Sequence, residues 1–202
     1  MQAILFDFGN VLGFFDHAKT LRRLEPYTDM SAADMYAAVY AGRLEDDFES
    51  GRISIEEFLS AFRTMCRLRC DNAVISGAVA DIFEPNPEIC SLIPRLKSHY
   101  RLLLGSNTNA LHSRHFLKQF EQILSSFTAV VLSHDIGVRK PRAGFFQHCQ
   151  NLAGCPPAEC LFIDDLPANI EGARAAGLQG AVYAPGQEFA NRLRELGVKI
   201  ED

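Results

Sequence analysis

The sequence lacks the features that mark membrane and secreted proteins. No apolar run reaches the ~18 residues that a membrane-spanning helix needs. The amino terminus has no basic segment followed by an apolar run and a cleavage site, so no secretory signal is predicted. Internal repeats and low-complexity tracts are also missing. We therefore expect a cytoplasmic protein that does not bind membranes.

Paired cysteines and an excess of positive charge are missing as well. The cysteines, at positions 66, 70, 90, 149, 155 and 160, form no CxxC motif, and scattered cysteines in a cytosolic enzyme are usually buried and reduced. The formal net charge of −5 gives no support for nucleic-acid binding, which usually needs a basic face. A local basic pocket for a phosphorylated substrate remains compatible with this charge.

The sequence does contain a regular alternation of short apolar runs and helix-like segments. Its 48% hydrophobic and 22% charged residues are typical of a globular protein. Compact apolar runs with β-branched or aromatic residues predict buried strands of a parallel sheet. These runs are AILFDFG (3–9), RLLLGSN (101–107), TAVVLSH (128–134), CLFIDDL (160–166) and QGAVYA (179–184). Helical periodicity lies at 89–96, 111–124, 144–152 and 170–176. Strand alternating with helix predicts an open α/β fold.

The alternation is interrupted between about residues 12 and 87. This stretch has helix-like patterns at 35–40, 55–66 and 74–83 and no convincing strand. We interpret it as a helical domain, residues 14–85, inserted into a discontinuous core made of 1–13 and 86–202. In the alternative interpretation these helices pack on one face of the sheet.

Polar side chains lie at the ends of four of the predicted strands. They are Asp7, Ser106, the pair Ser133–His134 and the pair Asp164–Asp165. In an open α/β sheet, ligands bind outside the carboxyl ends of the strands. We therefore expect these side chains to converge on one functional site.

The carboxylates of this set suit a nucleophile and a cation. Asp7 can attack phosphorus and form an acyl-phosphate, but its charge repels a phosphate unless a cation offsets both. Mg²⁺ prefers one or two carboxylates, several waters and the substrate phosphate. Asp7, Asp165 and the carbonyl of Gly9 fit this preference, with Asp164 acting directly or through water. Alternatively, Asp7 forms an Asx-type turn and one acid of the pair caps a helix.

Three further residues suit phosphate binding. The Ser106 hydroxyl and the Asn107 backbone N–H can hold phosphoryl oxygens, and Lys140 can offset charge on the nucleophile and the transferred group. The alternatives are an ordinary polar turn and a solvated lysine. His112 and His115 share a helical face, but without a third ligand we interpret them as surface or substrate-rim residues.

Taken in order, these motifs resemble those of the haloacid dehalogenase-like superfamily, whose members are mostly phosphatases. The resemblance covers the whole core: the nucleophile motif at 7–11, Ser106, Lys140, and Asp164–Asp165 followed by Asn169. It implies a Rossmann-like parallel sheet with the first strand central, and it implies that the insertion is the family's helical cap.

The resemblance also implies a Mg²⁺-dependent reaction in two steps. Asp7 attacks phosphorus in line, and water then hydrolyses the aspartyl-phosphate. The site residues carried over are catalytic Asp7, Ser106 and Lys140, substrate-binding Asn10, Ser106, Asn107 and Lys140, and metal-binding Asp7, Gly9, Asp164 and Asp165.

Longer stretches are similar to a bacterial subgroup, the α-D-glucose-1-phosphate phosphatases. These stretches are FDFGNVL, SNTNALH, LSHDIGVRKPRAGFFQH and DDLPANIEGARAAG. This similarity implies a sugar 1-phosphate as the small phosphorylated metabolite. We expect a monomer or a weak homodimer.

The sequence departs from the superfamily at Gly9. Most phosphatases of the superfamily carry an aspartate there, which acts as general acid and then base, a role typically worth about 10²–10⁴-fold in rate. Either the leaving group is good enough without it, as an anomeric oxygen is, or Asp16 or His17 substitutes, or turnover is weak. The rival functions are a 2-haloacid dehalogenase-type hydrolase, which attacks carbon without a metal, and a degenerate phosphate-binding protein.

Overall fold

The computed structural model describes residues 1–186 and 188–200, and its centre is a five-stranded sheet. The strand order is β5-β4-β1-β6-β7, and all neighbouring strands are parallel. The strands are β1 (Ala3–Phe6), β4 (Arg101–Ser106), β5 (Ala129–Leu132), β6 (Cys160–Asp164) and β7 (Gln179–Val182). All five predicted strands are present, and the α/β fold class with the first strand central is confirmed.

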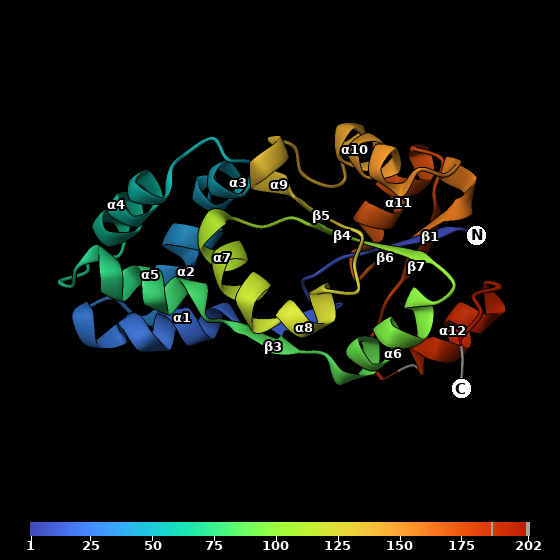
Figure 1. The fold of residues 1–202 in the computed structure, drawn as a ribbon. Coiled ribbons are helices and arrows are strands. Elements are labelled where there is room, and N and C mark those ends of the chain that lie inside the picture. Colours follow the sequence, from blue (N-terminus) through green and yellow to red (C-terminus); the bar gives the residue numbers. More distant parts are fainter. Residues whose placement is uncertain (187, 201–202) are drawn as a thin grey trace.

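Helices cover both faces of this sheet, which explains why the strands are apolar without alternation. Figure 1 shows α10 (Ala143–Ala153) and α11 (Pro167–Ala175) on one face, and α6 (Pro87–Lys97) and α12 (Phe189–Glu195) on the other. Successive residues of β1 point to opposite faces. Ala3 and Leu5 therefore pack with α10 and α11, while Ile4 and Phe6 pack on the α6 side.

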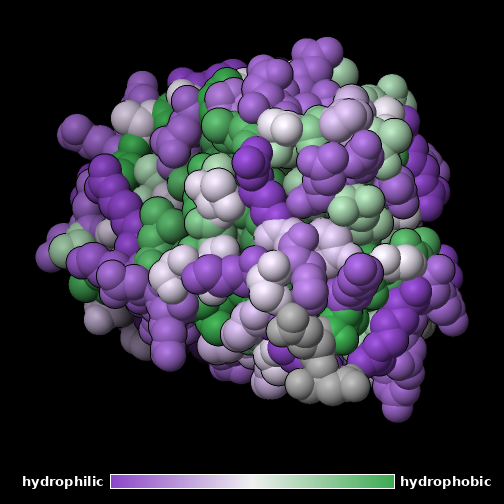
Figure 2. Space-filling view, turned by 45° about the vertical axis from the view of Figure 1, so that its right-hand side comes forward, coloured by the Kyte–Doolittle hydropathy of each residue, from purple (hydrophilic) through white to green (hydrophobic). Residues whose placement is uncertain are grey.

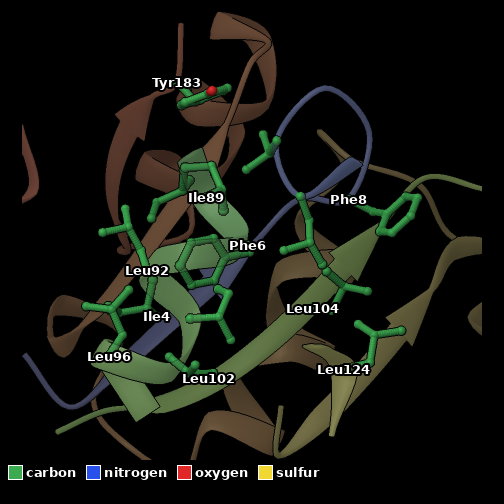
Figure 3. Packing of buried hydrophobic residues seen from close by; sticks show 14 of the residues in the cluster. Ile4, Phe6, Phe8, Ile89, Leu92, Leu96, Leu102, Leu104, Leu124 and Tyr183 are labelled. Atoms are coloured by element: carbon green, nitrogen blue, oxygen red, sulfur yellow. The ribbon is translucent and has the colours of Figure 1, made fainter. Parts of the chain in front are cut away.

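The cluster on the α6 side is the larger of the two core clusters. Figure 3 shows side chains from β1, β4 and α6 pointing toward one another: Ile4, Phe6, Leu102, Leu104, Ile89, Leu92 and Leu96. All of them are at most 3% exposed. Burying one such side chain contributes about 1.5–3 kcal/mol, so this cluster holds the sheet rigid beneath the strand ends.

The chain leaves and re-enters the core through two short antiparallel strands, β2 (Gly13–Phe15) and β3 (Phe83–Pro85). Asn86 fixes this crossing by donating to the Val11 carbonyl (2.7 Å) and to the Tyr183 hydroxyl (2.8 Å). The prediction that this region contains no strand is therefore wrong. Three-residue strands are too short to show a period in the sequence.

Five helices lie between β2 and β3 and form their own buried cluster, at the left of Figure 1. They are α1 (His17–Leu24), α2 (Ala32–Tyr40), α3 (Leu44–Glu49), α4 (Ile55–Met65) and α5 (Asn72–Ala80), with a 3₁₀ turn at Glu25–Tyr27. We call them the cap helices. The boundaries 14–85, 1–13 and 86–202 stay a prediction, and residues 187, 201 and 202 lie outside the described part.

Helix α7 (Ala110–Gln119) connects the two clusters. Leu111 packs with the cap helices, whereas Phe116 packs in the core. The single helix predicted at 111–124 divides at Phe120, where the backbone leaves helical geometry, and continues as α8 (Glu121–Leu124). The remaining elements are α9 (Ser133–Ile136) and a 3₁₀ turn at Pro157–Glu159.

The outer surface mixes residue types. Figure 2 shows hydrophobic residues reaching the surface in patches that hydrophilic side chains border. Such mixed exposure is ordinary for a globular protein and marks no docking site. Among the described residues, none of the helices is both long and apolar enough to cross a membrane.

Candidate active site

Asp7 and Asp164 lie side by side because their strands are neighbours. Phe6 of β1 is in register with Ile163 of β6, so the next residues, Asp7 and Asp164, lie at the same edge of the sheet. The Asp7 N–H donates to the Ile163 carbonyl (2.8 Å) and fixes this alignment. Asp164 is fully buried and Asp7 is 7% exposed.

Lys140 joins these two carboxylates. Its Nζ lies 2.6 Å from Asp7 Oδ1 and 2.8 Å from Asp164 Oδ2, and its side chain is 1% exposed. Burial opposes the charge on the lysine, but Asp7 and Asp164 outweigh burial and raise the pKa of Lys140. The lysine is therefore a permanent cation between two acids, and the alternative of a solvated surface lysine is wrong.

The acidity of Asp7 is set by competing influences. Burial raises its pKa to about 8, Lys140 counteracts this effect, and the charge of Asp164 adds to it. The protein alone thus holds this carboxyl near the border of ionisation at neutral pH. Additional positive charge at the site would favour the carboxylate form.

Three carboxylates are close enough to share one cation. Asp7, Asp164 and Asp165 each offer an oxygen, and these oxygens lie within 4.8 Å of one another. A cluster of carboxylate oxygens is the donor set that Mg²⁺ prefers. The residues present therefore fit a magnesium ion.

Asparagine side chains orient two of these acids. Asn10 Nδ2 donates to Asp165 Oδ2 (3.1 Å) from a left-handed backbone conformation (φ 54°) that asparagine tolerates. Asn169 Nδ2 lies 3.0 Å from both oxygens of Asp164. Neither acid caps α11, whose N-cap residue is Leu166. Asn10 was predicted to bind substrate, and the structure places it against Asp165.

Ser106 and Asn107 follow β4 at the same edge. Among the described residues, the buried Ser106 hydroxyl makes one long contact, 3.4 Å, with the Asn107 carbonyl. The Asn107 amide donates to the Lys140 carbonyl (3.1 Å), and its Oδ1 accepts from the Lys140 N–H (2.9 Å). The side chain of Asn107 therefore supports Lys140, while its backbone N–H remains the candidate phosphate donor.

These residues surround a cavity of about 190 Å³. Its lining is Asp7, Gly9, Asn10, Phe15, Asn107, Arg139, Lys140, Asp165, Leu166 and Asn169. This cavity thus brings the predicted nucleophile and lysine together with Asp165, whereas Asp164 and Ser106 are not among its lining residues. The catalytic and binding roles of the individual residues stay predictions.

Phe15 covers Gly9. A Cβ built on Gly9 would lie 3.1 Å from Phe15 Cε1, closer than side chains normally approach. The ring of Phe15 therefore occupies the space into which a side chain at position 9 would extend.

Several candidate residues lie outside this constellation. Asp16 caps α1 by accepting from the Ala18 N–H (2.8 Å) and pairs with Arg22 (3.1 Å). These contacts lower the pKa of Asp16, so its half-exposed carboxyl stays ionised. Ser133 bonds to the backbone of Thr108 and Glu49.

Residues of α3 also reach the site, which the sequence did not indicate. Arg139 lines the cavity and pairs with Glu49 (2.6 Å) and with Asp46. Its partners come from a cap helix about ninety positions earlier in the chain. No local motif signals such a contact, because it depends on how the cap helices pack against the core.

Comparison with known proteins identifies the family. A model of haloacid dehalogenase-like hydrolases matches residues 1–177. The chain therefore belongs to the haloacid dehalogenase-like hydrolase family, and the resemblance to this superfamily is confirmed. It is an enzyme family whose members hydrolyse their substrates.

Individual relatives are more distant. N-acylneuraminate-9-phosphatase of Mus musculus is 29% identical over 97 residues, which cover 48% of this chain and 39% of that protein. A HAD-like family hydrolase from Porphyromonas gingivalis is 28% identical, with a TM-score of 0.82 over 98% of each chain. HAD family enzyme bt-2542 of Bacteroides thetaiotaomicron, crystallised with magnesium and inorganic phosphate, is 22% identical. It covers 96% of this chain and 100% of its own with a TM-score of 0.82, which shows a shared fold.

Proposed function

We propose that this chain is a Mg²⁺-dependent phosphomonoester hydrolase that forms an aspartyl-phosphate on Asp7. One observation carries the proposal: Lys140 Nζ lies between Asp7 and Asp164, and Lys140, Asp7 and Asp165 line one small cavity. A buried cation between acids at the ends of parallel strands suits the transfer of a doubly charged group, since charge compensation is the main requirement of phosphoryl transfer.

The reaction follows from this arrangement. Asp7 attacks phosphorus, the bond from phosphorus to the leaving oxygen breaks, and water then hydrolyses the acyl-phosphate. Lys140 offsets the charge of the transferred group, and the Ser106 hydroxyl and Asn107 N–H hold its oxygens. Asp7, Asp164, Asp165 and the Gly9 carbonyl would hold Mg²⁺, which when bound supplies charge that keeps Asp7 ionised and draws the phosphate in.

A sugar 1-phosphate is the substrate we propose. An anomeric oxygen is a better leaving group than a simple alkoxide, which suits a site with Gly9 in place of the usual acid. The resemblance of four long sequence stretches to sugar 1-phosphate phosphatases supports the same class. The mouse relative, a phosphatase, and the neighbour crystallised with magnesium and inorganic phosphate support phosphate chemistry. A monomer or weak homodimer stays our expectation.

Two other functions compete with this proposal. A dehalogenase also uses an aspartate after the first strand but attacks carbon and needs no metal. The three clustered carboxylates argue against it, because they would repel a haloacid carboxylate unless a cation were bound. A degenerate protein that binds phosphate without turnover is the other rival.

The test is phosphate release from a panel of sugar 1-phosphates, sugar 6-phosphates and alkyl phosphates, with Mg²⁺ or with EDTA. The variants are Asp7→Asn and the exposed control Asp135→Asn, whose side chain is 64% exposed. Release that needs metal and Asp7 but not Asp135 supports a phosphatase, and preference for 1-phosphates supports the substrate. Metal-independent halide release from haloacids, without phosphate release, would establish the dehalogenase instead.

A further inference from the structure

A second, smaller hollow adjoins the cavity on the other side of Gly9. It has a volume of about 40 Å³, and its lining is Phe8, Gly9, Phe15, His17, Ile82, Phe83, Ser106, Asn107, Thr108 and His112. Gly9, Phe15 and Asn107 line both spaces. Ser106 and Asn107, the proposed phosphate-binding residues, also line this hollow, so it lies next to the place where the transferred group would be held.

His17, the first residue of α1, lines the hollow in a constrained position. Its ring packs on Tyr40, with centroids 4.1 Å apart, and meets the edge of Phe15 at 5.2 Å. His17 Nε2 lies 3.5 Å from Glu45 Oε1 of α3. Within the described chain, the buried Nδ1 has no hydrogen-bond partner. A buried polar atom left unpaired costs about 1–3 kcal/mol, so this atom is poised for a partner that a ligand would supply.

The charge states of His17 and Glu45 complement each other. Burial lowers the pKa of His17 to about 4, although the neighbouring Asp16 opposes the change. Burial raises the pKa of Glu45 to about 8, with Glu49 adding to the effect and Arg139 opposing it. At neutral pH the Glu45 carboxyl is therefore protonated and the imidazole is neutral. Donation of the carboxyl proton to Nε2 requires the imidazole hydrogen to be on Nδ1.

The other titratable groups around the pair do not change this assignment. His112 of α7 lies 6.3 Å from the His17 ring, and its own pKa is lowered by burial, so it is neutral. Burial raises the pKa of the Tyr40 hydroxyl, so it stays protonated. The 3.5 Å contact is thus not an ion pair, and it is too long for a hydrogen bond in this structure. Catalytic contacts of this kind shorten when a substrate binds.

We propose that Glu45 and His17 form a proton relay borne by the cap helices, which takes over the general acid–base role that Gly9 cannot perform. The relay rests on the proposed phosphatase function. His17 is the catalytic residue, because its Nδ1 would touch the leaving oxygen, and Glu45 is a positioning residue and proton reservoir that acts through His17.

The proton balance closes over the two steps. While Asp7 bonds to phosphorus and the leaving oxygen departs, His17 Nδ1 gives its proton to that oxygen and Nε2 takes the proton of Glu45. In the second step water bonds to phosphorus and the bond to Asp7 breaks. The water proton then passes to His17 Nδ1, and the Nε2 proton returns to Glu45. Ester and water become alcohol and phosphate, with no other reactant.

Steric and electrostatic facts favour this relay over the nearer candidates. Phe15 fills the space beside Gly9, and His17 packs against that ring and lines the hollow next to it. Asp16 is engaged with Arg22 and is ionised, so it has no proton to give.

The test compares two substrates that differ in their need for an acid. p-Nitrophenyl phosphate has a good leaving group, whereas ethyl phosphate has a poor one. In Glu45→Gln and His17→Asn we expect kcat/KM, which reports formation of the aspartyl-phosphate, to fall about 10²-fold or more for ethyl phosphate and less than about threefold for p-nitrophenyl phosphate. Wild-type turnover of ethyl phosphate should decline above about pH 8, where Glu45 ionises, and Glu45→Gln should lack this decline.

His115→Asn is the matched control, since His115 lies on α7 and pairs with the exposed Asp81. Equal losses on both substrates, or none, would overturn the relay while leaving the phosphatase intact. A wild-type protein that hydrolyses neither substrate would instead overturn the proposed function. A ¹⁵N NMR spectrum gives a readout without turnover: His17 should be neutral at pH 7 with its hydrogen on Nδ1, and a protonated ring would contradict the relay.

Discussion

Asn107 and Lys140 hold each other through two hydrogen bonds that run in opposite directions. The Asn107 amide donates to the Lys140 carbonyl and its oxygen accepts from the Lys140 N–H. The peptide of Lys140 therefore cannot turn without breaking both bonds. Lys140 Nζ contacts both Asp7 and Asp164, so its position depends on how its backbone is held. Asn107, in the turn after β4, therefore helps to position the charge of a lysine from a different loop.

Replacing Lys140 with methionine tests the central ion pair. The variant leaves Asp7 and Asp164 buried without a cation, so we expect kcat to fall by at least about 10²-fold. In metal-free buffer the free energy of unfolding should fall by about 3–5 kcal/mol. Urea denaturation and phosphate release measure the two effects, with the exposed Arg142→Ala as control. Wild-type turnover in the methionine variant would remove Lys140 from the mechanism.

Replacing Asn169 with alanine tests the support of the metal site. Asn169 contacts both oxygens of Asp164, and loss of such an outer partner typically weakens metal binding about 10–100-fold. Titration of activity with Mg²⁺ should show a correspondingly higher half-saturation, with kcat at saturating metal much less affected. An unchanged Mg²⁺ dependence would show that Asp164 does not depend on this amide. Asn151→Ala, an exposed asparagine of α10, is the control.

Restoring an aspartate at position 9 tests the steric role of Phe15. Gly9→Asp alone should be destabilised, since its Cβ would meet the Phe15 ring at 3.1 Å; overpacking of this kind costs about 1–3 kcal/mol. When Phe15 is already alanine, Gly9→Asp should cost little stability, so the double variant should be about as stable as Phe15→Ala alone. A double-mutant cycle by thermal unfolding measures the coupling. Additive effects would mean that Phe15 moves aside freely.

Asp16→Ala separates a helix cap from a catalytic acid. Asp16 caps α1, and loss of such a cap costs about 1 kcal/mol. Its carboxyl lies outside both cavities described above, so we expect unchanged kcat on every substrate. Calorimetry and phosphate release measure the two quantities. A turnover loss of tenfold or more would restore Asp16 as the substitute acid and weaken the case for His17.

The stability of the protein should depend on pH through His112. Burial lowers the pKa of His112 from the ordinary 6.5 to about 3, and His17 adds to the effect. Below pH 6.5 the unfolded chain thus binds a proton at His112 that the folded chain does not bind. The free energy of unfolding therefore falls as the pH falls. His112→Gln should flatten this dependence by about 1.4 kcal/mol per pH unit between roughly pH 6 and 4. An unchanged slope in urea denaturation would contradict the burial of a neutral ring.

The sequence predicted the sheet and the convergence of its polar ends for physical reasons. A strand buried on both faces must be apolar along its length, and the register of β1 and β6 then forces Asp7 and Asp164 together. Features that depend on packing between distant segments gave no signal. The contact of Arg139 with α3 and the ring of Phe15 over Gly9 arise only when the cap helices meet the core.

The paired crossing of β2 and β3 has a consequence for engineering this molecule. The chain departs at Phe15 and returns at Phe83, and these two residues are direct partners in the same small sheet. A segment whose ends lie one strand spacing apart would match this crossing, so we expect the strand order of the large sheet to survive its insertion between them. Such an exchange would remove His17 and Glu45 together with the cap helices, while Asp7 and Lys140 stay in place.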